Sequence, residues 1–404
     1  MLSLRKLMAK LPRHQGRWEG LIRGLSRATT QDSPTAGTHL DEVTAFGTNP
    51  GNLRMFRYLP SKLAADPALV VVLHGCTQTA AGYDLVAGWS TLADRYGFAL
   101  LMPEQQRSNN PNGCFNWFQP GDIERGRGEA LSIRQMIEKM ITDTGVDRSR
   151  VFVTGLSAGG AMTSVMLACY PEVFAGGAII AGLPYGAATN VQQAYESMFQ
   201  SPTRSAREWG DLVRAAATHD GPWPRISIWH GSADRTVIPN NALEILKQWT
   251  DIHGLLLRPS VEQTVDGYPR QAWMNEAEEE LIESYTITQM GHGTPLATGQ
   301  ADGRCGAPGP FLLEVGISSS YHIAKFFGLA HPGESPRAHL KTITIAPEQL
   351  VPHAEPIRAQ PLRLTGDLPD EKLEPASQGS NIPRIDIGAF ITRALTAAGL
   401  MKDR

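Results

Sequence analysis

The chain has 404 residues, of which 42% are hydrophobic and 19% are charged, and its 37 Lys and Arg against 40 Asp and Glu give a net charge of −3. Without an overall positive field the protein lacks the attraction that holds a nucleic-acid backbone, so nucleic acid is not an expected partner. Its apolar stretches are strand-sized and well short of the roughly 20 residues that cross a bilayer, so no transmembrane segment is expected.

Residues 1–38 form a basic arm ahead of the main body. Leu4, Leu7 and Leu11 recur at helical spacing, which predicts an amphipathic helix. Two interpretations stay open: a frayed leader or a helix packed on the body, or a helix that contacts a lipid surface or a polymer granule. Met1–Arg27 has no uninterrupted apolar core and no small-residue cleavage site. It is therefore unlike a secretory signal, which favours a cytoplasmic location.

The body, residues 39–331, alternates between strand-like and helix-like segments. At its start, Glu42–Leu59 has turn residues at Asn49–Asn52, which predicts a hairpin and an antiparallel edge. The later strand-like runs are short, apolar and bounded by Gly or Pro, as is typical of strands buried on both faces. These runs are Leu69–His74, Phe98–Pro103, Arg150–Gly155, Ala175–Ala181, Arg225–Gly231 and Ser284–Met290.

Helical periodicity occupies the segments between these runs. The predicted helices are Leu85–Tyr96, Gly128–Thr144, Ala158–Tyr170, Asn241–His253 and Ser319–Phe327. The alternation predicts an α/β fold, in which helices cover both faces of a mostly parallel sheet. A longer stretch, residues 182–224, contains a candidate helix at Ser205–Ala217 and is long enough to form a small cap at the carboxyl edge of the sheet.

The last segment, residues 332–404, is enriched in proline. Because proline removes backbone hydrogen-bond donors, this segment is expected to be an irregular, extended tail. Within it, the apolar residues of Ile385–Met401 predict a final short helix that docks on the body or binds another molecule.

The sharpest chemical signal is the sequence Gly155-Leu156-Ser157-Ala158-Gly159. It follows a predicted strand and opens a predicted helix. A nucleophile elbow needs this composition, because the serine backbone is strained and larger side chains two residues away would clash with the neighbouring strand and helix. The position at a helix N-terminus also favours developing negative charge. Ser157 is therefore the candidate nucleophile, and a structural turn is the alternative.

A nucleophilic serine needs a histidine base, which follows it in the chain in this type of sheet. His74 precedes the serine, His230 lies inside an apolar strand as a core histidine would, and His253 and His322 fall in predicted helices. His292, flanked by glycines, follows the last predicted strand of the sheet. It is therefore the candidate base.

The base in turn needs a carboxylate to orient it, and Asp234 stands between the serine and the histidine in the chain, after the strand Arg225–Gly231. The alternative is a turn aspartate that caps the next helix. Asp220, Asp251 and Asp266 are less well placed, being before the strand, in a helix and in a turn respectively.

Acyl transfer also needs donors aimed at the oxyanion. One is expected from the backbone N–H of Ala158, directly after the nucleophile. The second is expected from the loop after the strand that ends in His74-Gly75, where the N–H of Cys76 is the candidate.

The four cysteines, Cys76, Cys114, Cys169 and Cys305, have no C-x-x-C spacing, which excludes zinc ribbons and thioredoxin-like sites. Cys76 and Cys114 lie in loops that are expected to meet over the site, so a bridge between them is a hypothesis. The redox compartment stays open.

The segments Leu73–Gln78, Cys114–Trp117, Gly155–Met162, Trp229–Asp234 and Met290–Gly293 carry a resemblance to a known family. Together they resemble the poly(3-hydroxybutyrate) depolymerase family of esterases, a group close to feruloyl and acetylxylan esterases. The resemblance covers about residues 39–330. It implies an α/β-hydrolase catalytic domain, no metal or organic cofactor, and hydrolysis of a carboxylic ester through a serine acyl-enzyme.

The resemblance also implies roles for individual residues. It makes Ser157 the nucleophile, Asp234 the acid, His292 the base, and Cys76 and Ala158 the oxyanion donors.

Gln78 and Trp117 are similar to substrate-binding positions of the family.

Secreted members of the family carry a signal peptide and a substrate-binding domain rich in small polar residues, and neither feature is recognisable in this sequence. The resemblance makes poly(3-hydroxybutyrate) or hydroxyacyl oligomers the expected substrates, and the two missing features favour amorphous intracellular polymer, oligomers or a small ester over extracellular crystalline polymer. The alternatives are feruloyl or acetylxylan esters, or a non-catalytic granule-associated protein. The arm is a candidate for polymer-granule contact, and the resemblance adds an extracellular location to the cytoplasmic one.

Overall fold

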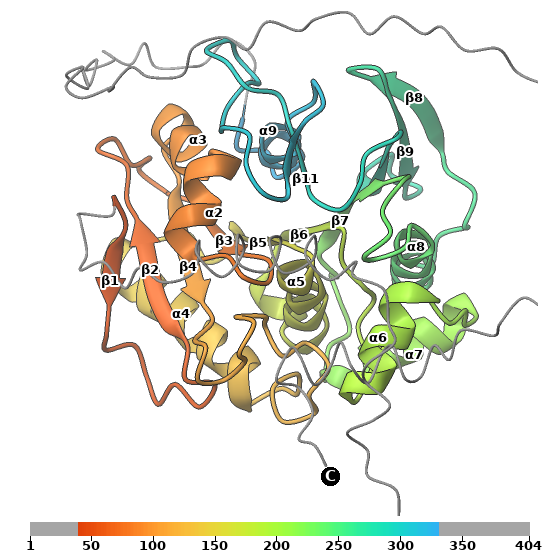
Figure 1. The fold of residues 1–404 in the computed structure, drawn as a ribbon, viewed down its shortest axis with the longest axis horizontal. Coiled ribbons are helices and arrows are strands. Elements are labelled where there is room, and N and C mark those ends of the chain that lie inside the picture. The colour runs from red at the N-terminus through yellow and green to blue at the C-terminus, as the bar shows by residue number, and fades with distance from the viewer. Residues whose placement is uncertain (1–38, 331–404) are drawn as a thin grey trace, which may run out of the picture.

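The computed structural model describes residues 39–330, which fold around one twisted sheet (Figure 1). Within these residues the sheet has ten strands in the order β1-β2-β4-β3-β5-β6-β7-β10-β9-β8. Six neighbouring strands of this order run parallel to one another: β4, β3, β5, β6, β7 and β10. The strands are β1 (Asp41–Val43), β2 (Arg54–Tyr58), β3 (Leu69–Leu73), β4 (Ala99–Glu104), β5 (Val151–Leu156), β6 (Gly176–Ile180), β7 (Arg225–Gly231), β8 (Val261–Val265), β9 (Tyr268–Met274) and β10 (Glu280–Ile287).

Every strand predicted for the sheet is present, and the expected antiparallel edge is formed by β1 and β2. The opposite edge was not predicted. There, β8 and β9 form an antiparallel hairpin whose turn is Asp266-Gly267, both with positive φ. Most side chains of β8 are exposed, so this strand lacks the apolar run by which the central strands were recognised.

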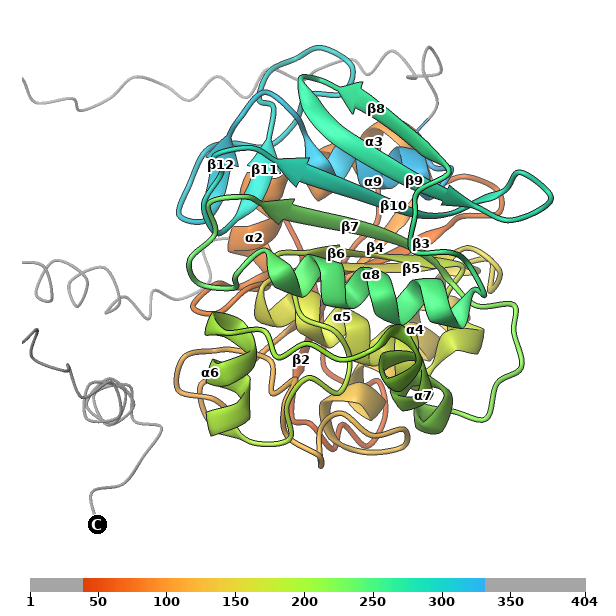
Figure 2. The same cartoon turned by 90° about the vertical axis from the view of Figure 1, so that its right-hand side faces the viewer.

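Helices cover both faces of the sheet (Figure 2). In β3, Leu69, Val71 and Leu73 pack into the core cluster that includes α4, α5, α7 and α8, whereas Val70 and Val72 pack into the cluster that includes α2, α3 and α9. The apolar runs therefore belong to strands buried on both faces, and the chain has the α/β-hydrolase fold. The helices are α2 (Ala80–Ala87), α3 (Trp89–Tyr96), α4 (Gly128–Thr144), α5 (Ala158–Cys169), α6 (Val191–Phe199), α7 (Ala206–Ala216), α8 (Asn240–Ile252) and α9 (Ser319–Phe326), with a 3₁₀ turn at Pro171–Val173.

One helix differs from its prediction. The segment Leu85–Tyr96 is divided at Gly88, which ends α2 in the left-handed region, with φ 78°. A Cβ at Gly88 would lie 2.6 Å from the backbone nitrogen of Gly306, because the loop through Gly306 crosses at this point. The break is therefore set by a contact that is remote in sequence.

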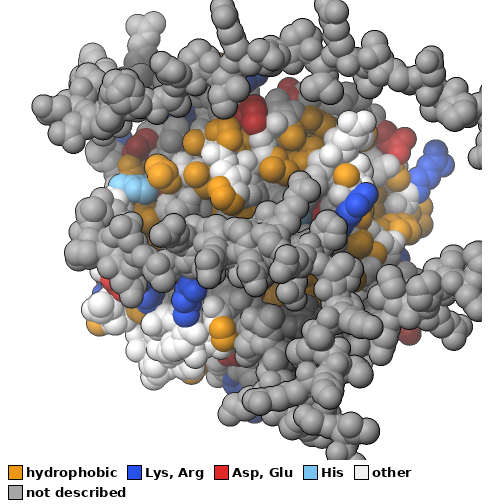
Figure 3. Space-filling model, in the orientation of Figure 1, with side chains coloured by type: hydrophobic (Ala, Val, Ile, Leu, Met, Phe, Trp, Pro, Cys, Tyr) orange, Lys and Arg blue, Asp and Glu red, His pale blue; other side chains and the backbone are white. Residues whose placement is uncertain are grey.

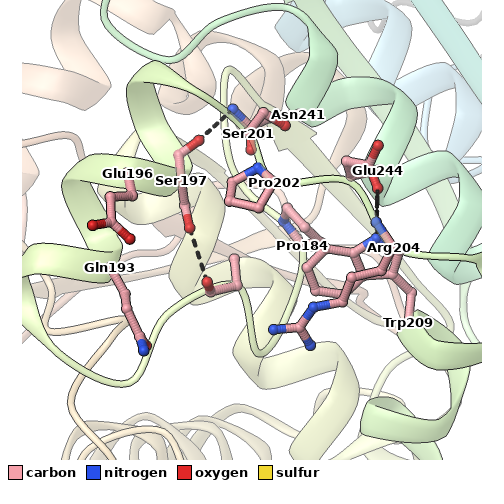
Figure 4. A pocket seen from close by; sticks show the side chains of 11 residues that line it. Pro184, Gln193, Glu196, Ser197, Ser201, Pro202, Arg204, Trp209, Asn241 and Glu244 are labelled. Atoms are coloured by element: carbon pink, nitrogen blue, oxygen red, sulfur yellow. Dashed lines mark hydrogen bonds between the residues drawn. The ribbon is translucent and has the colours of Figure 1, made fainter.

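The segment 182–224 carries α6 and α7. Ser205 caps α7 with a reciprocal hydrogen-bond pair to Glu208, and α7 packs beside α8 and α5. A cavity of about 190 Å³ lies among these elements, and Trp209, one of its lining residues, donates from Nε1 to Glu244 at 2.6 Å (Figure 4). The role of the segment as a cap stays a prediction.

A small parallel pair, β11 (Thr294–Leu296) and β12 (Leu312–Glu314), stands apart from the main sheet. None of the helices within residues 39–330 has the length and apolar character needed to cross a membrane. The predicted arm, residues 1–38, and the predicted tail with its final helix, residues 332–404, lie outside the described residues.

Candidate active site

Ser157 occupies a sharp turn between β5 and α5. Its backbone has φ 58° and ψ −117°, a conformation that L-residues rarely adopt. The flanking glycines permit this turn, since a Cβ on Gly155 would lie 2.4 Å from the carbonyl oxygen of Gly159, and a Cβ on Gly159 would lie 2.3 Å from that of Leu73. The segment therefore has the geometry of a strained elbow.

Ser157, His292 and Asp234 form a continuous chain of hydrogen bonds. His292 Nε2 lies 2.9 Å from Ser157 Oγ, and His292 Nδ1 lies 2.7 Å from Asp234 Oδ2. When Nδ1 donates to the carboxylate, Nε2 is the unprotonated nitrogen that can accept the serine proton. The structure thus brings together the three residues that were singled out from the sequence.

Asp234 is held as a carboxylate. Its Oδ1 accepts the N–H groups of Thr236 and Val237, at 2.8 and 2.9 Å. Burial opposes ionisation, but hydrogen bonds with His230 and His292 outweigh it, so the pKa of Asp234 lies below its usual value. Asp234 therefore makes the turn that was considered as its alternative role and also presents a charged oxygen to the histidine.

The loops that carry Asp234 and His292 are joined through their backbones. The N–H of Ala233 donates to the carbonyl of Met290 at 2.9 Å. Gly231, the last residue of β7, allows this approach, because a Cβ there would lie 2.4 Å from the same carbonyl oxygen. The separation of the Asp234 and His292 loops is therefore fixed by main-chain contacts.

The loop after β3 is tied to a second loop. Cys76 and Cys114 form a disulfide, which confirms the hypothesised bridge. The N–H of Thr77 donates to the carbonyl of Asn112 at 2.7 Å. One covalent bond and one hydrogen bond therefore connect the segment around Cys76 to residues 112–114.

The two candidate oxyanion donors lie on either side of the elbow. The N–H of Ala158 belongs to the first turn of α5, where backbone N–H groups have no partner within the helix. Within residues 39–330, no group accepts a hydrogen bond from the N–H of Cys76. Both N–H groups are thus available to a substrate oxygen, and their role stays a prediction.

Gln78 and Trp117 have structural contacts. Gln78 Oε1 accepts the N–H of Gly75 at 2.8 Å, so this side chain braces the loop that carries Cys76. Trp117 is only 7% exposed, packs in the main core and makes an edge-on contact with Phe118. Substrate binding by Gln78 and Trp117 stays a prediction.

Glu129, at the start of α4, was missed by the sequence analysis. One oxygen of this fully buried carboxyl accepts from the side-chain amides of Gln105 and Asn116, and the other accepts the Asn116 N–H at 2.9 Å. Gln105 also donates to the carbonyl of Cys114 at 3.1 Å. Burial, with the charge of Asp122 second, raises the pKa of Glu129 to about 8. The carboxyl therefore supports the loop that is bonded to Cys76.

Two other histidines near the site have structural roles. His230 is buried and donates to the carbonyl of Val237 at 2.8 Å, as predicted for a core histidine. His74 donates from Nδ1 to the carbonyl of Gly75 and accepts the N–H of Gln105 on Nε2. Burial lowers the pKa of His74 to about 4, so it is neutral at pH 7.

The arrangement combines a serine hydroxyl, an imidazole within hydrogen-bond distance of it, a charged carboxylate and two N–H groups that have no acceptor among residues 39–330. This set can carry out acyl transfer. Within residues 39–330, no cluster of three His, Cys, Asp or Glu side chains has the arrangement of a metal site.

Known esterases resemble this chain over most of its length. The family model described as esterase PHB depolymerase matches residues 53–264. The chain is 50% identical over 291 residues to poly(3-hydroxyalkanoate) depolymerase C of Paucimonas lemoignei, covering 72% of this chain and 70% of that protein. It is 34% identical over 297 residues to feruloyl esterase B of Neurospora crassa, covering 72% of this chain and 92% of that protein.

Among solved structures, an acetyl xylan esterase from Aspergillus awamori matches with a TM-score of 0.61 and 29% identity, over 72% of this chain and 99% of that one. Sequence and structure comparisons thus agree with the resemblance found in the motifs. The chain is a carboxylic ester hydrolase and belongs to the PHB depolymerase family of esterases.

Proposed function

We propose that the protein hydrolyses carboxylic esters through an acyl-enzyme on Ser157, with His292 as general base and acid and Asp234 as its orienting carboxylate. The observation that carries this proposal is the unbroken hydrogen-bonded chain from Ser157 Oγ through the imidazole to Asp234. The strained elbow supports it, because a residue held in such a conformation exposes its hydroxyl at the end of a buried strand.

In the first step, Ser157 Oγ attacks the ester carbonyl carbon while its proton passes to His292 Nε2. The carbonyl electron pair moves onto oxygen, and the resulting oxyanion accepts hydrogen bonds from the N–H groups of Cys76 and Ala158. When the C–O bond breaks, His292 returns the proton to the leaving alcohol. Water then attacks the acyl-enzyme by the same route, releasing the acid and restoring Ser157.

The proposed substrate is a poly(3-hydroxyalkanoate), most simply poly(3-hydroxybutyrate), or its oligomers. The support is the 50% identity to a poly(3-hydroxyalkanoate) depolymerase, against 34% to a feruloyl esterase over a similar length. Contact of the basic arm, residues 1–38, with a polymer granule or membrane surface belongs to the same proposal.

A feruloyl or acetylxylan ester is the second candidate, favoured by the similarity to an acetyl xylan esterase along 99% of that chain. A non-catalytic granule-associated protein is a candidate of another class, but it would have no need for the intact hydrogen-bonded chain. A fluorophosphonate probe separates these classes, because it labels an activated serine.

The test is hydrolysis of amorphous poly(3-hydroxybutyrate) by the protein and by Ser157→Ala, with soluble 3-hydroxybutyrate and its oligomers measured. Removing the nucleophile is expected to lower kcat on the order of a million-fold. Ser149→Ala, which changes an exposed serine, is the matched control and should retain full activity. Undiminished release by Ser157→Ala would exclude the proposed nucleophile. Serine-dependent cleavage of aryl or acetyl sugar esters without release from the polymer would favour the second candidate.

A further inference from the structure

Phe311 is an exposed aromatic residue in an unusual backbone conformation. Its side chain is 44% exposed, and its φ is 64°, in the left-handed region. For a bulky residue this conformation is a genuine outlier, and it persists only where the surrounding structure imposes it. An exposed ring gains little from burial, so the hydrophobic core does not account for its placement.

The backbone of Phe311 is fixed against the segment that carries His292. The carbonyl of Phe311 accepts the N–H of Thr294 at 2.8 Å, and the next residue, Leu312, pairs with Thr294 where β12 meets β11. A Cβ on Gly293 would lie 2.5 Å from the Phe311 carbonyl oxygen, so the residue after the histidine must be small. The strained residue is therefore built onto the histidine loop.

The ring of Phe311 lies beside the imidazole. The two ring centroids are 6.1 Å apart, and the planes meet at 75°, an edge-on contact. The same imidazole presents Nε2 to Ser157 Oγ at 2.9 Å. Because Nε2 must pass its proton to the departing alcohol, the alcohol portion of the ester has to come within hydrogen-bond reach of this nitrogen. The phenyl ring is therefore a direct neighbour of the imidazole that the alcohol portion has to reach.

The segment that carries Phe311 adjoins a part of the surface that is rich in apolar side chains. Figure 3 views the face at which the parallel strands end, and hydrophobic side chains gather on its upper part, over α2 and the segment around β11. β11 pairs with β12, which begins directly after Phe311. A hydrocarbon group beside the ring would thus leave water on contact.

We propose that Phe311 forms an apolar wall for the alcohol portion of the ester, selecting esters whose leaving alcohol carries a hydrocarbon group, as the next hydroxyacyl unit of a polyester does. This inference rests on the proposed function of Ser157 and His292. The selectivity of Phe311 for the alcohol belongs to the acylation step, because the alcohol has left before water attacks the acyl-enzyme.

The test uses two esters with the same 3-hydroxybutyryl acyl group: the methyl ester, and the ester to a second 3-hydroxybutyrate unit capped as its methyl ester. Phe311→Ala keeps a Cβ and hence the same backbone restriction, and it should lower kcat/KM on the dimer by about tenfold. On the methyl ester the change should stay within about twofold, since a methyl group offers the ring little surface. Phe311→Leu should retain part of the preference.

The control is Leu257→Ala, which removes an apolar side chain of similar exposure, 45%, from the loop between α8 and β8. It should leave both esters unaffected. An equal loss on both esters would show that Phe311 acts on His292 and not on the alcohol, and no loss on either would show that the ring does not meet the substrate. A larger loss on acetylated xylose than on an acetyl ester of a hydrocarbon alcohol would equally overturn the proposal.

Failure of the proposed function would look different. If Ser157→Ala cleaved both esters as fast as the unaltered protein, the function would be wrong whatever Phe311 does. If Ser157→Ala were inactive while Phe311→Ala treated the two esters alike, the esterase would stand and only the alcohol wall would fall.

Discussion

The elbow at Ser157 and the loop around Cys76 meet at the same site but are held in different ways. The elbow is shaped by its own sequence, because Gly155 and Gly159 leave room for backbone oxygens that lie 2.4 and 2.3 Å from where their Cβ atoms would be. The loop around Cys76 is held from a distance, by the disulfide to Cys114 and by the hydrogen bonds that end at Glu129. A substitution in the elbow should therefore lower stability and turnover together. A substitution among the residues that support the Cys76 loop should lower stability and turnover to different extents.

The largest effect is expected from Gly159→Ala. The added methyl group would meet two carbonyl oxygens, those of Leu73 at 2.3 Å and His74 at 2.5 Å, and neither belongs to a flexible side chain. Overpacking of this kind costs about 3 kcal/mol or more, so thermal unfolding should shift to much lower temperature and turnover should be lost. Gly121→Ala is the matched control, since no atom lies within 4 Å of its Cβ position. Normal stability and turnover in Gly159→Ala would show that the elbow tolerates rearrangement.

A smaller effect, divided between stability and turnover, is expected from Cys114→Ser. The bridge closes a loop with a sequence separation of 38 residues, so its loss should lower the free energy of unfolding by about 3–4 kcal/mol. Turnover on a short p-nitrophenyl ester should fall, by up to about 100-fold if the Cys76 N–H is an oxyanion donor.

Cys305→Ser serves as the control for this substitution, because Cys305 is a buried free cysteine. It should not reproduce the loss of turnover. If Cys114→Ser unfolded more easily but turned over ester at the normal rate, the bridge would stabilise the fold without positioning an oxyanion donor.

The same contrast explains how much could be predicted from the sequence. The central strands and the elbow were predictable because each is encoded by a short run of residues: continuous apolar strands, and glycines at fixed spacing around Ser157. His292 and Asp234 followed from chain order in this type of sheet. The comparisons then established the esterase family, and the hydrogen-bonded chain gave the geometry.

What could not be predicted depends on contacts between distant segments. The break at Gly88 exists because the loop through Gly306 crosses there. Glu129 lies in the first turn of α4, where the helix dipole alone would explain an acidic residue. Nothing in the local sequence indicates its three hydrogen bonds to a remote loop. The exposed hairpin of β8 and β9 carried one usable signal, the Asp266-Gly267 turn between its strands.

Glu129→Gln should produce the smallest effect. It distinguishes stabilisation of the fold from positioning of the loop around Cys76. The amide keeps one accepting oxygen and loses the other, so about 1 kcal/mol of hydrogen bonding to the loop is lost and turnover should fall about fivefold, with little change in KM. Because the pKa of Glu129 is raised to about 8 from 4.5, the folded protein holds a proton that the unfolded chain has lost between these pH values. The contribution of this group to stability is therefore present below pH 4.5 and declines as the pH rises toward 8, and Glu129→Gln should remove that decline.

Glu283→Gln tests the same carboxyl chemistry away from the site. Glu283 is also buried, its pKa is raised to about 7 chiefly by burial, and it binds Ser227 and Arg270 instead of the loop. Chemical unfolding at pH 5 and pH 8 should show a reduced pH dependence in both variants, whereas turnover should fall only in Glu129→Gln. Equal turnover in the two variants would mean that Glu129 stabilises the fold as any buried carboxyl does. A selective loss would show that the position of the Cys76 loop depends on an interaction chain that reaches α4.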